Sequence, residues 1–431
     1  MKNIILIAVI SICFVPARGQ QQSLLLEEYR VMAVEYNHNL KAAQKNIAVS
    51  MEFENMARAD LKPKFSAGAN FQYTGNPMEL NLNIPALDTP LSFKGRSLNY
   101  GASLSLQQPI YTGGRLTESI RIAKLQQTHA NASADVVMSE VCFQTDIQYW
   151  NTVARKEMVG IANDFHNSIS SLVQTIKERV EVGLVDPQEL LMAEVKLNEA
   201  QYQLLQAKSN MEVSRMALNS LIGVEIGYAT KIDESIPILK ETDIVINTVP
   251  ERAELSMAQS NIKIAQSTLK LNDAQYKPQF YVGAEGNYSS PGYNFDKDLD
   301  FNYAIYAKLS IPIFEWGKRN SRKRASKRQI EIATDNLHQV EDNINLEIET
   351  SRVALSQAIQ RVDLSLSSLG KAKENEQKAL ERYSEGKISI LEVIDAQTYR
   401  QTSQINYVQA KVAAQGHYAE VMKALNQYNN Q

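Results

Sequence analysis

Residues 61–74 read LKPKFSAGANFQYT and residues 276–289 read YKPQFYVGAEGNYS, so one pattern occurs twice, 215 positions apart. From Phe65, and again from Phe280, apolar residues alternate with polar or small ones. A β-strand sends successive side chains to opposite faces, so a period of two collects the apolar set on one face. Both stretches therefore predict a strand with one apolar and one polar face.

The duplication extends along most of the chain. Pro109-Ile110 with Gly114-Arg115 recurs 203 positions later as Pro312-Ile313 with Gly317-Lys318. Between these matches the offset changes by a single step of 12 residues, which indicates one unit that occurs twice, with a longer loop in its first copy. The predicted organisation is a signal peptide over 1–19, a first structural repeat over 20–222, an irregular linker over 223–250 and a second structural repeat over 251–431.

The N-terminus has the three parts of a signal peptide. Lys2 supplies the positive charge, residues 4–15 form a short apolar run, and Ala17-Arg18-Gly19 places small residues where a signal peptidase cleaves. The run is too short for a membrane anchor. A lipoprotein would use Cys13, but a large residue precedes it where a small one is expected. After cleavage, Cys142 stays as a lone cysteine, which we expect to be a small buried apolar residue.

Four amphipathic strands are predicted, two in each repeat, at 65–74, 100–109, 279–289 and 302–311. About ten residues suffice for a tilted strand to cross a bilayer, although an ordinary two-faced sheet in a water-soluble domain is the alternative. Four strands cannot close a barrel, and open edges in lipid would leave backbone groups unpaired. Several copies must therefore contribute, and three copies give twelve strands. The long loops 75–98 and 290–300 would then lie at the outer surface.

The rest of the chain is predicted to be helical. Hairpins of two antiparallel helices are expected over 115–222 and 318–429, and their proline-free outgoing arms can each reach about 100 Å. The segments 24–61 and 252–276 are expected to complete the returning path. The first return helix carries apolar residues every seven positions, with small residues three positions later, which is typical of a coiled coil: Leu190, Leu197 and Leu204 with Ala193, Ala200 and Ala207.

Composition argues against several classes of function. Lys and Arg number 45 against 48 Asp and Glu, and this net charge of −3 argues against a nucleic-acid binder. The five histidines are scattered without ligand spacing, and neither a phosphate-binding glycine loop nor a nucleophile elbow is visible. We therefore predict no enzyme activity, no catalytic residue, no metal site and no cofactor. The basic run 318–328 is interpreted as a solvated helix face, with contact to anionic lipid headgroups as the alternative.

The duplicated arrangement resembles the TolC-like outer membrane factor family over nearly all of the predicted mature chain. The matching motifs are the doubled Lys-Pro-x-Phe strand start and the doubled Pro-Ile-[Tyr/Phe]-x-x-Gly-[Arg/Lys] strand end, together with the hairpin tips 179–183 and 382–386 and the run 391–397. The resemblance implies an α+β membrane protein. In it, a trimeric 12-stranded β-barrel with four strands per chain continues into a long antiparallel α-helical coiled-coil barrel.

The resemblance also implies which residues carry the function. The Arg-x-x-x-Gly tips, here Arg179 to Gly183 and Arg382 to Gly386, would contact a periplasmic adaptor, although the glycines could simply form the turns. Glu392 and Asp395 would narrow the closed pore aperture. Glu392 also fits a capping box with Ser389, whereas Asp395 has Met192 as its counterpart in the first repeat, so we favour Asp395 as the pore residue.

The function implied is a passive exit duct. A homotrimer in the cell outer membrane, in contact with its lipid and extending into the periplasm, would work with an adaptor and an inner-membrane pump in a tripartite efflux or type I secretion system. A secreted coiled-coil scaffold or adhesin without a transport role is the alternative. Neither the transported substrate, the pump class nor the gating trigger can be read from these residues.

Overall fold

The computed structural model describes residues 25–82, 85, 91–240, 251–293 and 298–429. The predicted signal peptide and residues 241–250 of the predicted linker lie outside the described residues. The chain forms two compact units, and each unit combines segments from both halves of the sequence. Unit 1 contains Met1–Asn37, Ser139–Thr248 and Glu349–Gln431, and unit 2 contains His38–Met138 and Val249–Ile348.

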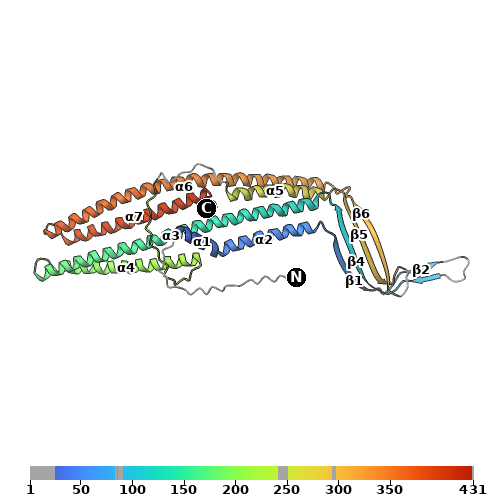
Figure 1. Cartoon of the computed structure of the whole chain (residues 1–431), viewed down its shortest axis with the longest axis horizontal. Helices are drawn as coiled ribbons and strands as arrows, with labels where there is room; N and C mark the ends of the chain where they lie inside the picture. Colours follow the sequence, from blue (N-terminus) through green and yellow to red (C-terminus); the bar gives the residue numbers. More distant parts are fainter. Residues whose placement is uncertain (1–24, 83–84, 86–90, 241–250, 294–297, 430–431) are drawn as a thin grey trace, which may run out of the picture. The chain divides into compact units, whose positions relative to one another are not determined.

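The centre of unit 2 is a four-stranded antiparallel sheet in the order β1-β4-β5-β6. In Figure 1 these strands lie side by side, and their bounds are β1 Lys64–Tyr73, β4 Leu98–Tyr111, β5 Gln279–Ser290 and β6 Asp300–Ser310. The four predicted strands therefore form, with ends that differ by at most two residues. The strand β4 continues past Pro109 because the register shifts between Pro109 and Tyr111, an irregularity that tolerates a residue without an N–H group.

The strand register confirms the two-faced pattern. Phe65 pairs with Leu106, Leu106 with Ala284, and Ala284 with Ile305, so one apolar row crosses all four strands. The adjacent row is polar in β1, β4 and β5, and Ser66 and Ser105 share a hydrogen bond of 2.7 Å between their hydroxyl groups. Large side chains of the apolar face are exposed in the single chain, so nothing in the described part of the chain covers this face.

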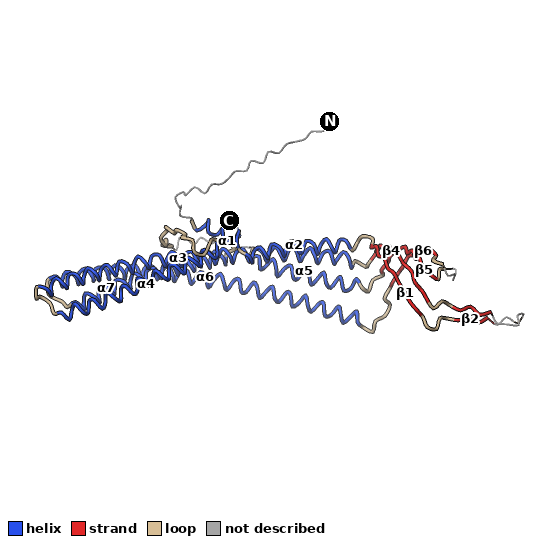
Figure 2. The backbone as a smooth tube through the Cα atoms, turned by 90° about the horizontal axis from the view of Figure 1, so that it is seen from below, coloured by secondary structure: helices blue, strands red, loops and turns tan. Residues whose placement is uncertain are grey.

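A second, smaller sheet lies within the long loop that we predicted between 75 and 98. The strands β2 (Glu79–Leu82) and β3 (Leu91–Lys94) pair antiparallel. Four residues are too short a run for an alternation to stand out against the prolines around them, so the sequence pattern missed this hairpin. Figure 2 shows it at one end of the sheet, while α2 (His38–Ala59) and α5 (Ala253–Ala274) lead away from the other end.

The two long predicted helices are continuous. They are α3 (Arg115–Glu181) and α6 (Lys318–Ser384), with 67 residues each. Their returning arms are α4 (Pro187–Ile222) and α7 (Ile390–Ala424). On α4 the predicted seam is buried or half-buried, with Ala193 and Ala200 fully buried. No helix among the described residues is both long enough and apolar enough to cross a membrane.

The N-terminal helical segment is divided, which differs from the single helix expected over 24–61. Its first part, α1 (Leu26–Tyr36), ends at Asn37, whose backbone is extended with φ −56° and ψ 121°. The division lets α1 pack on α4, and the Tyr36 ring lies where a side chain at Gly223 would otherwise be. Gly223 ends α4 in the left-handed region with φ 76°, so glycine is required there for two reasons.

A buried ion pair joins α1 to α3. Both nitrogens Nε and Nη2 of Arg30 donate to the Asp146 carboxylate at 2.7 Å, and the Tyr428 hydroxyl donates to the same carboxylate at 2.6 Å. Tyr428 belongs to the short 3-10 helix η2 (Gln427–Asn429), so both ends of the described chain meet α3 here. Burial raises the pKa of the Tyr428 phenol, and the Asp146 charge raises it further. Cys142 is buried nearby as expected, and burial raises the pKa of its thiol to about 11.

Candidate hairpin-tip site

The tips of the two helical hairpins in unit 1 have the same backbone turn. Gly183 has φ 71° and donates to the Val180 carbonyl at 2.9 Å, while Leu184 donates to the Arg179 carbonyl at 2.9 Å. In the second tip, Gly386 has φ 71° and its N–H reaches the Tyr383 carbonyl at 3.0 Å, and the next N–H reaches the Arg382 carbonyl at 2.9 Å. Each glycine occupies a left-handed position that disfavours other residues, so the turn alone explains both glycines.

Both return helices begin with a cap, and the sequence analysis predicts the one at Ser389. The Asp186 carboxylate accepts the Gln188 N–H at 2.7 Å, and Pro187 opens α4. At the start of α7, the Ser389 N–H donates to the Glu392 carboxylate at 3.3 Å. These contacts satisfy N–H groups that a helix start leaves unpaired. Glu392 is therefore engaged at its own helix end.

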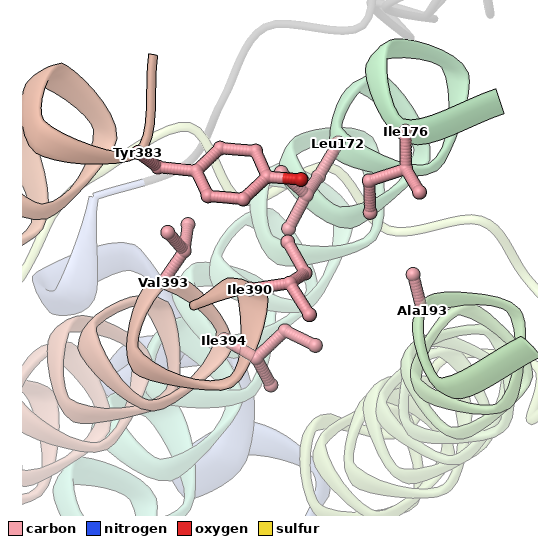
Figure 3. Close-up of a cluster of buried hydrophobic side chains, with 7 residues drawn as sticks. All are labelled: Leu172, Ile176, Ala193, Tyr383, Ile390, Val393 and Ile394. Carbon is pink, nitrogen blue, oxygen red and sulfur yellow. The ribbon is translucent and has the colours of Figure 1, made fainter. Parts of the chain in front are cut away.

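A buried apolar cluster lies beneath the tips and joins the two hairpins. Figure 3 shows the Tyr383 ring directed toward Leu172, with Ile390 between α3 and α7. Val393 is fully buried in this cluster. Each of the four helix arms contributes, because the members are Leu172 and Ile176 of α3, Ala193 of α4, Tyr383 of α6, and Ile390, Val393 and Ile394 of α7.

The two tip arginines have different surroundings. Arg179 reaches across to the other hairpin, where it donates to the carbonyls of Tyr383 at 3.2 Å and Ser384 at 3.3 Å. Its guanidinium also lies 4.9 Å from the centre of the Tyr383 ring. Burial and then the Glu189 charge raise the pKa of the Tyr383 phenol, against the opposing effect of Arg179. Arg382 is exposed, and it makes no side-chain hydrogen bond or ion pair within the described residues.

Sequence reasoning missed Tyr383 as the residue that orients Arg179. The available signal was the difference between the two tips, because Tyr383 of the second tip corresponds to Val180 of the first at the offset of 203. The difference coincides with the contact that Arg179 makes with the Tyr383 ring.

The two predicted aperture residues share one exposed side of α7. Glu392 and Asp395 are both exposed, whereas Val393 and Ala396 between and beside them are buried. Residues three apart on a helix are neighbours, so the structure brings the two carboxylates to one face. Asp395 has no side-chain partner among the described residues, which distinguishes it from Glu392. Within the described residues, no group of three or more His, Cys, Asp or Glu side chains could hold a metal ion.

Comparisons with known proteins agree on one family and one fold. The family model described as outer membrane efflux protein matches residues 30–224 and 248–427. The cobalt-zinc-cadmium resistance protein CzcC of Cupriavidus metallidurans is 22% identical over 368 residues, which cover 80% of this chain and 84% of that protein. The Campylobacter jejuni CmeC outer membrane channel has a TM-score of 0.74 and 19% identity, with 93% of this chain and 85% of that one covered. The outer membrane protein VceC of Vibrio cholerae has a TM-score of 0.75 and 16% identity, with 93% and 96% covered.

Proposed function

The chain belongs to the outer membrane efflux protein family, and from this premise we propose that it is the exit duct of a tripartite efflux or type I secretion system. Family membership places it in the outer membrane with an extension into the periplasm. The matching family is described as outer membrane efflux protein and the CmeC protein as an outer membrane channel, while the lack of enzyme activity stays a prediction.

One observation carries the proposal: the sheet is open, apolar on one face, and uncovered on that face. Within the described residues, β1 and β6 each pair on one side only. Unpaired edge groups in lipid cost several kcal/mol each, so the sheet requires partners there. Successive strands run antiparallel, and an even number per copy lets β6 of one copy pair antiparallel with β1 of the next. Three copies would close a 12-stranded barrel with the apolar face toward lipid.

The helical hairpins continue this duct in our proposal. Internal duplication supports a ring in which two similar hairpins from each of three copies alternate, because the tips share their turn hydrogen bonds at a constant offset. Arg382 is the better candidate for docking the periplasmic adaptor, since its guanidinium is exposed. Arg179 is already bound to the neighbouring tip, so its role in docking would be to shape that surface.

The exposed carboxylates of α7 support a cation-selective aperture. In a trimer, Glu392 and Asp395 would contribute six carboxylates around the axis. The carboxylates of such a ring attract cations and repel one another, and this repulsion makes the closed form of the aperture adjustable. The name of the Cupriavidus relative refers to cobalt, zinc and cadmium resistance, so divalent cations delivered by an inner-membrane pump are the first cargo to test.

The test combines assembly state with conductance. Full-length protein extracted from outer membranes in detergent is cross-linked, sized and inserted into planar bilayers. A trimer with ion-conducting openings is the expected result. A water-soluble monomer, or a trimer that never conducts, would refute the duct and favour the secreted scaffold or adhesin.

A further inference from the structure

The link between β6 and α6 in unit 2 exposes large apolar side chains. Ile313 is 94% exposed and Trp316 is 90% exposed, and Phe314 is exposed between them. The rings of Phe314 and Trp316 contact each other edge to face, with centroids 5.0 Å apart. Trp316 has φ 47°, in the left-handed region that non-glycine residues rarely adopt. Trp316 is thus an exposed tryptophan at a backbone conformation that disfavours residues other than glycine.

The equivalent link of the first repeat shows that the turn does not need this tryptophan. There Gly113 stands at the corresponding position, with φ 67°. A Cβ added to Gly113 would lie 2.7 Å from the Ala274 carbonyl oxygen and 2.7 Å from the Lys277 Cβ, so this link is packed against the α5–β5 connection. Similar left-handed turns therefore carry a packed glycine in one copy and an exposed tryptophan in the other, which leaves the tryptophan available to an occupant outside the chain.

Seven cationic residues follow within the first eleven residues of α6. Some are already occupied: Arg319 pairs with Asp273 at 2.8 Å, and Arg322 donates to Gln275 at 2.6 Å. Ser326 is buried and accepts a hydrogen bond from Asn272, so this side of α6 faces α5.

Three further cations of this run lack acidic partners within the described residues. Lys323 and Lys327 are exposed, four residues apart, and make no side-chain hydrogen bond or ion pair within the described residues. Arg324 donates only to the neutral hydroxyl of Ser321, at 3.1 Å. Three positive charges beside an exposed aromatic pair would complement an anionic partner with an apolar part.

From this arrangement we propose that the β6–α6 link is a binding site for acidic phospholipid of the inner leaflet. Phe314 and Trp316 enter the boundary between headgroups and acyl chains, where aromatic residues of membrane proteins collect. Lys323, Arg324 and Lys327 bind the phosphates, because anionic headgroups attract basic side chains near the surface. The proposal rests on the outer-membrane barrel proposed above, with which the site is continuous through β6.

Charge argues against a second copy as the partner of the basic residues. In a closed ring, the part of the neighbour that corresponds to the α5–β5 connection would be its α2–β1 connection, residues 60–64, which read DLKPK. That segment carries two lysines and one aspartate, so its net charge is positive. In the proposed ring this segment lies beside the link, because β6 would pair with β1 of the next copy, but its net positive charge cannot neutralise the three cations of α6.

Tryptophan fluorescence tests the site in the assembled protein. The chain contains two tryptophans, and Trp150 is buried, so Trp150→Phe leaves Trp316 as the reporter. The protein is reconstituted in vesicles of mixed phosphatidylcholine and phosphatidylglycerol, in which one lipid at a time is brominated. We expect strong quenching, with at least a fivefold preference for brominated phosphatidylglycerol. If Trp150→Phe does not fold, the loss of quenching in Trp316→Phe gives the same reading.

A charge-matched pair of variants separates specific binding from general attraction. Lys323→Gln/Lys327→Gln is expected to remove most of the phosphatidylglycerol preference, since each of the two basic residues near an anionic surface contributes a factor of about five. Lys371→Gln/Lys373→Gln removes the same charge from exposed positions farther along α6 and should leave the preference unchanged. Absence of quenching, or equal quenching by both lipids, would overturn the proposal. If the lipid result is negative but the protein is still a conducting trimer, the lipid site fails and the proposed duct stands. The failure of the lipid site is therefore distinguishable from the failure of the duct.

Discussion

Replacing Asp146 by asparagine tests whether the buried pair with Arg30 holds α1 in place. The side chains of Arg30 and Asp146 are 12% and 4% exposed, and two hydrogen bonds of 2.7 Å join them. For unit charges about 4 Å apart at an effective dielectric constant near 20, Coulomb's law gives about 4 kcal/mol. Removal of one partner of a buried pair typically costs about 3–5 kcal/mol, in agreement with that figure.

The assay is amide hydrogen exchange of α1 in the intact protein, followed by mass spectrometry. A loss of about 3–5 kcal/mol would speed exchange of Leu26–Tyr36 between about a hundredfold and a few thousandfold, since about 1.4 kcal/mol corresponds to a factor of ten. Glu27 provides the control, because it also pairs with Arg30 at 2.7 Å but its side chain is 59% exposed. Glu27→Gln should change exchange by about fivefold at most.

A third variant distinguishes charge from packing. Arg30→Met with Asp146→Leu removes both buried charges together and should recover most of the protection that Asp146→Asn loses. The reasoning is refuted if Asp146→Asn accelerates exchange of α1 less than about fivefold, or if Glu27→Gln accelerates it as much.

Three further predictions concern other parts of the chain. Asp395→Ala should lower the cation selectivity of single channels in planar bilayers, and unchanged selectivity would remove this residue from the pore. Gly223→Ala should lower the thermal midpoint, because the left-handed conformation alone costs about 1–2 kcal/mol and a ring blocks the added carbon, whereas Gly160→Ala in an open helical position should not. Burial raises the pKa of Glu140, but hydrogen bonds from Lys423 and Gln144 lower it by more, so the net pKa is depressed. The Glu140–Lys423 pair therefore stabilises the fold above the unfolded carboxyl pKa near 4.3, and this stabilisation is lost as pH falls through the folded pKa. The difference in thermal midpoint between wild type and Lys423→Met should therefore disappear with acidification. A difference that stays constant with pH would contradict the assignment.

The hairpin tips show how far local pattern carries a prediction of the site. Gly183 and Gly386 were predictable because a glycine after a long helical run has one common use, and Ser389 with Glu392 forms a recognisable cap. The contact of Arg179 with Tyr383 was not predictable, because it joins residues 204 positions apart. The arginine that sequence reasoning grouped with Arg382 is thus bound within the chain.

The division between α1 and α2 has the same origin. No proline or glycine marks a break near Asn37, and the break is stabilised by the contacts of α1 with Asp146 and α4, which lie far along the sequence. The hairpin β2–β3 was missed for the opposite reason, since its strands are too short for a period to be recognised.

By itself, the sequence determined the alternation of the strands, the uninterrupted length of α3 and α6, the turn chemistry of both tips and the family, because each depends on residues that are neighbours along the chain or on motifs that occur twice. Only the tertiary structure decided which arginine is free, where Asp146 finds its cation, and that Trp316 stands exposed where Gly113 is packed. These features depend on contacts between distant segments, and spacing within one segment carries no information about the atoms that another segment brings against it.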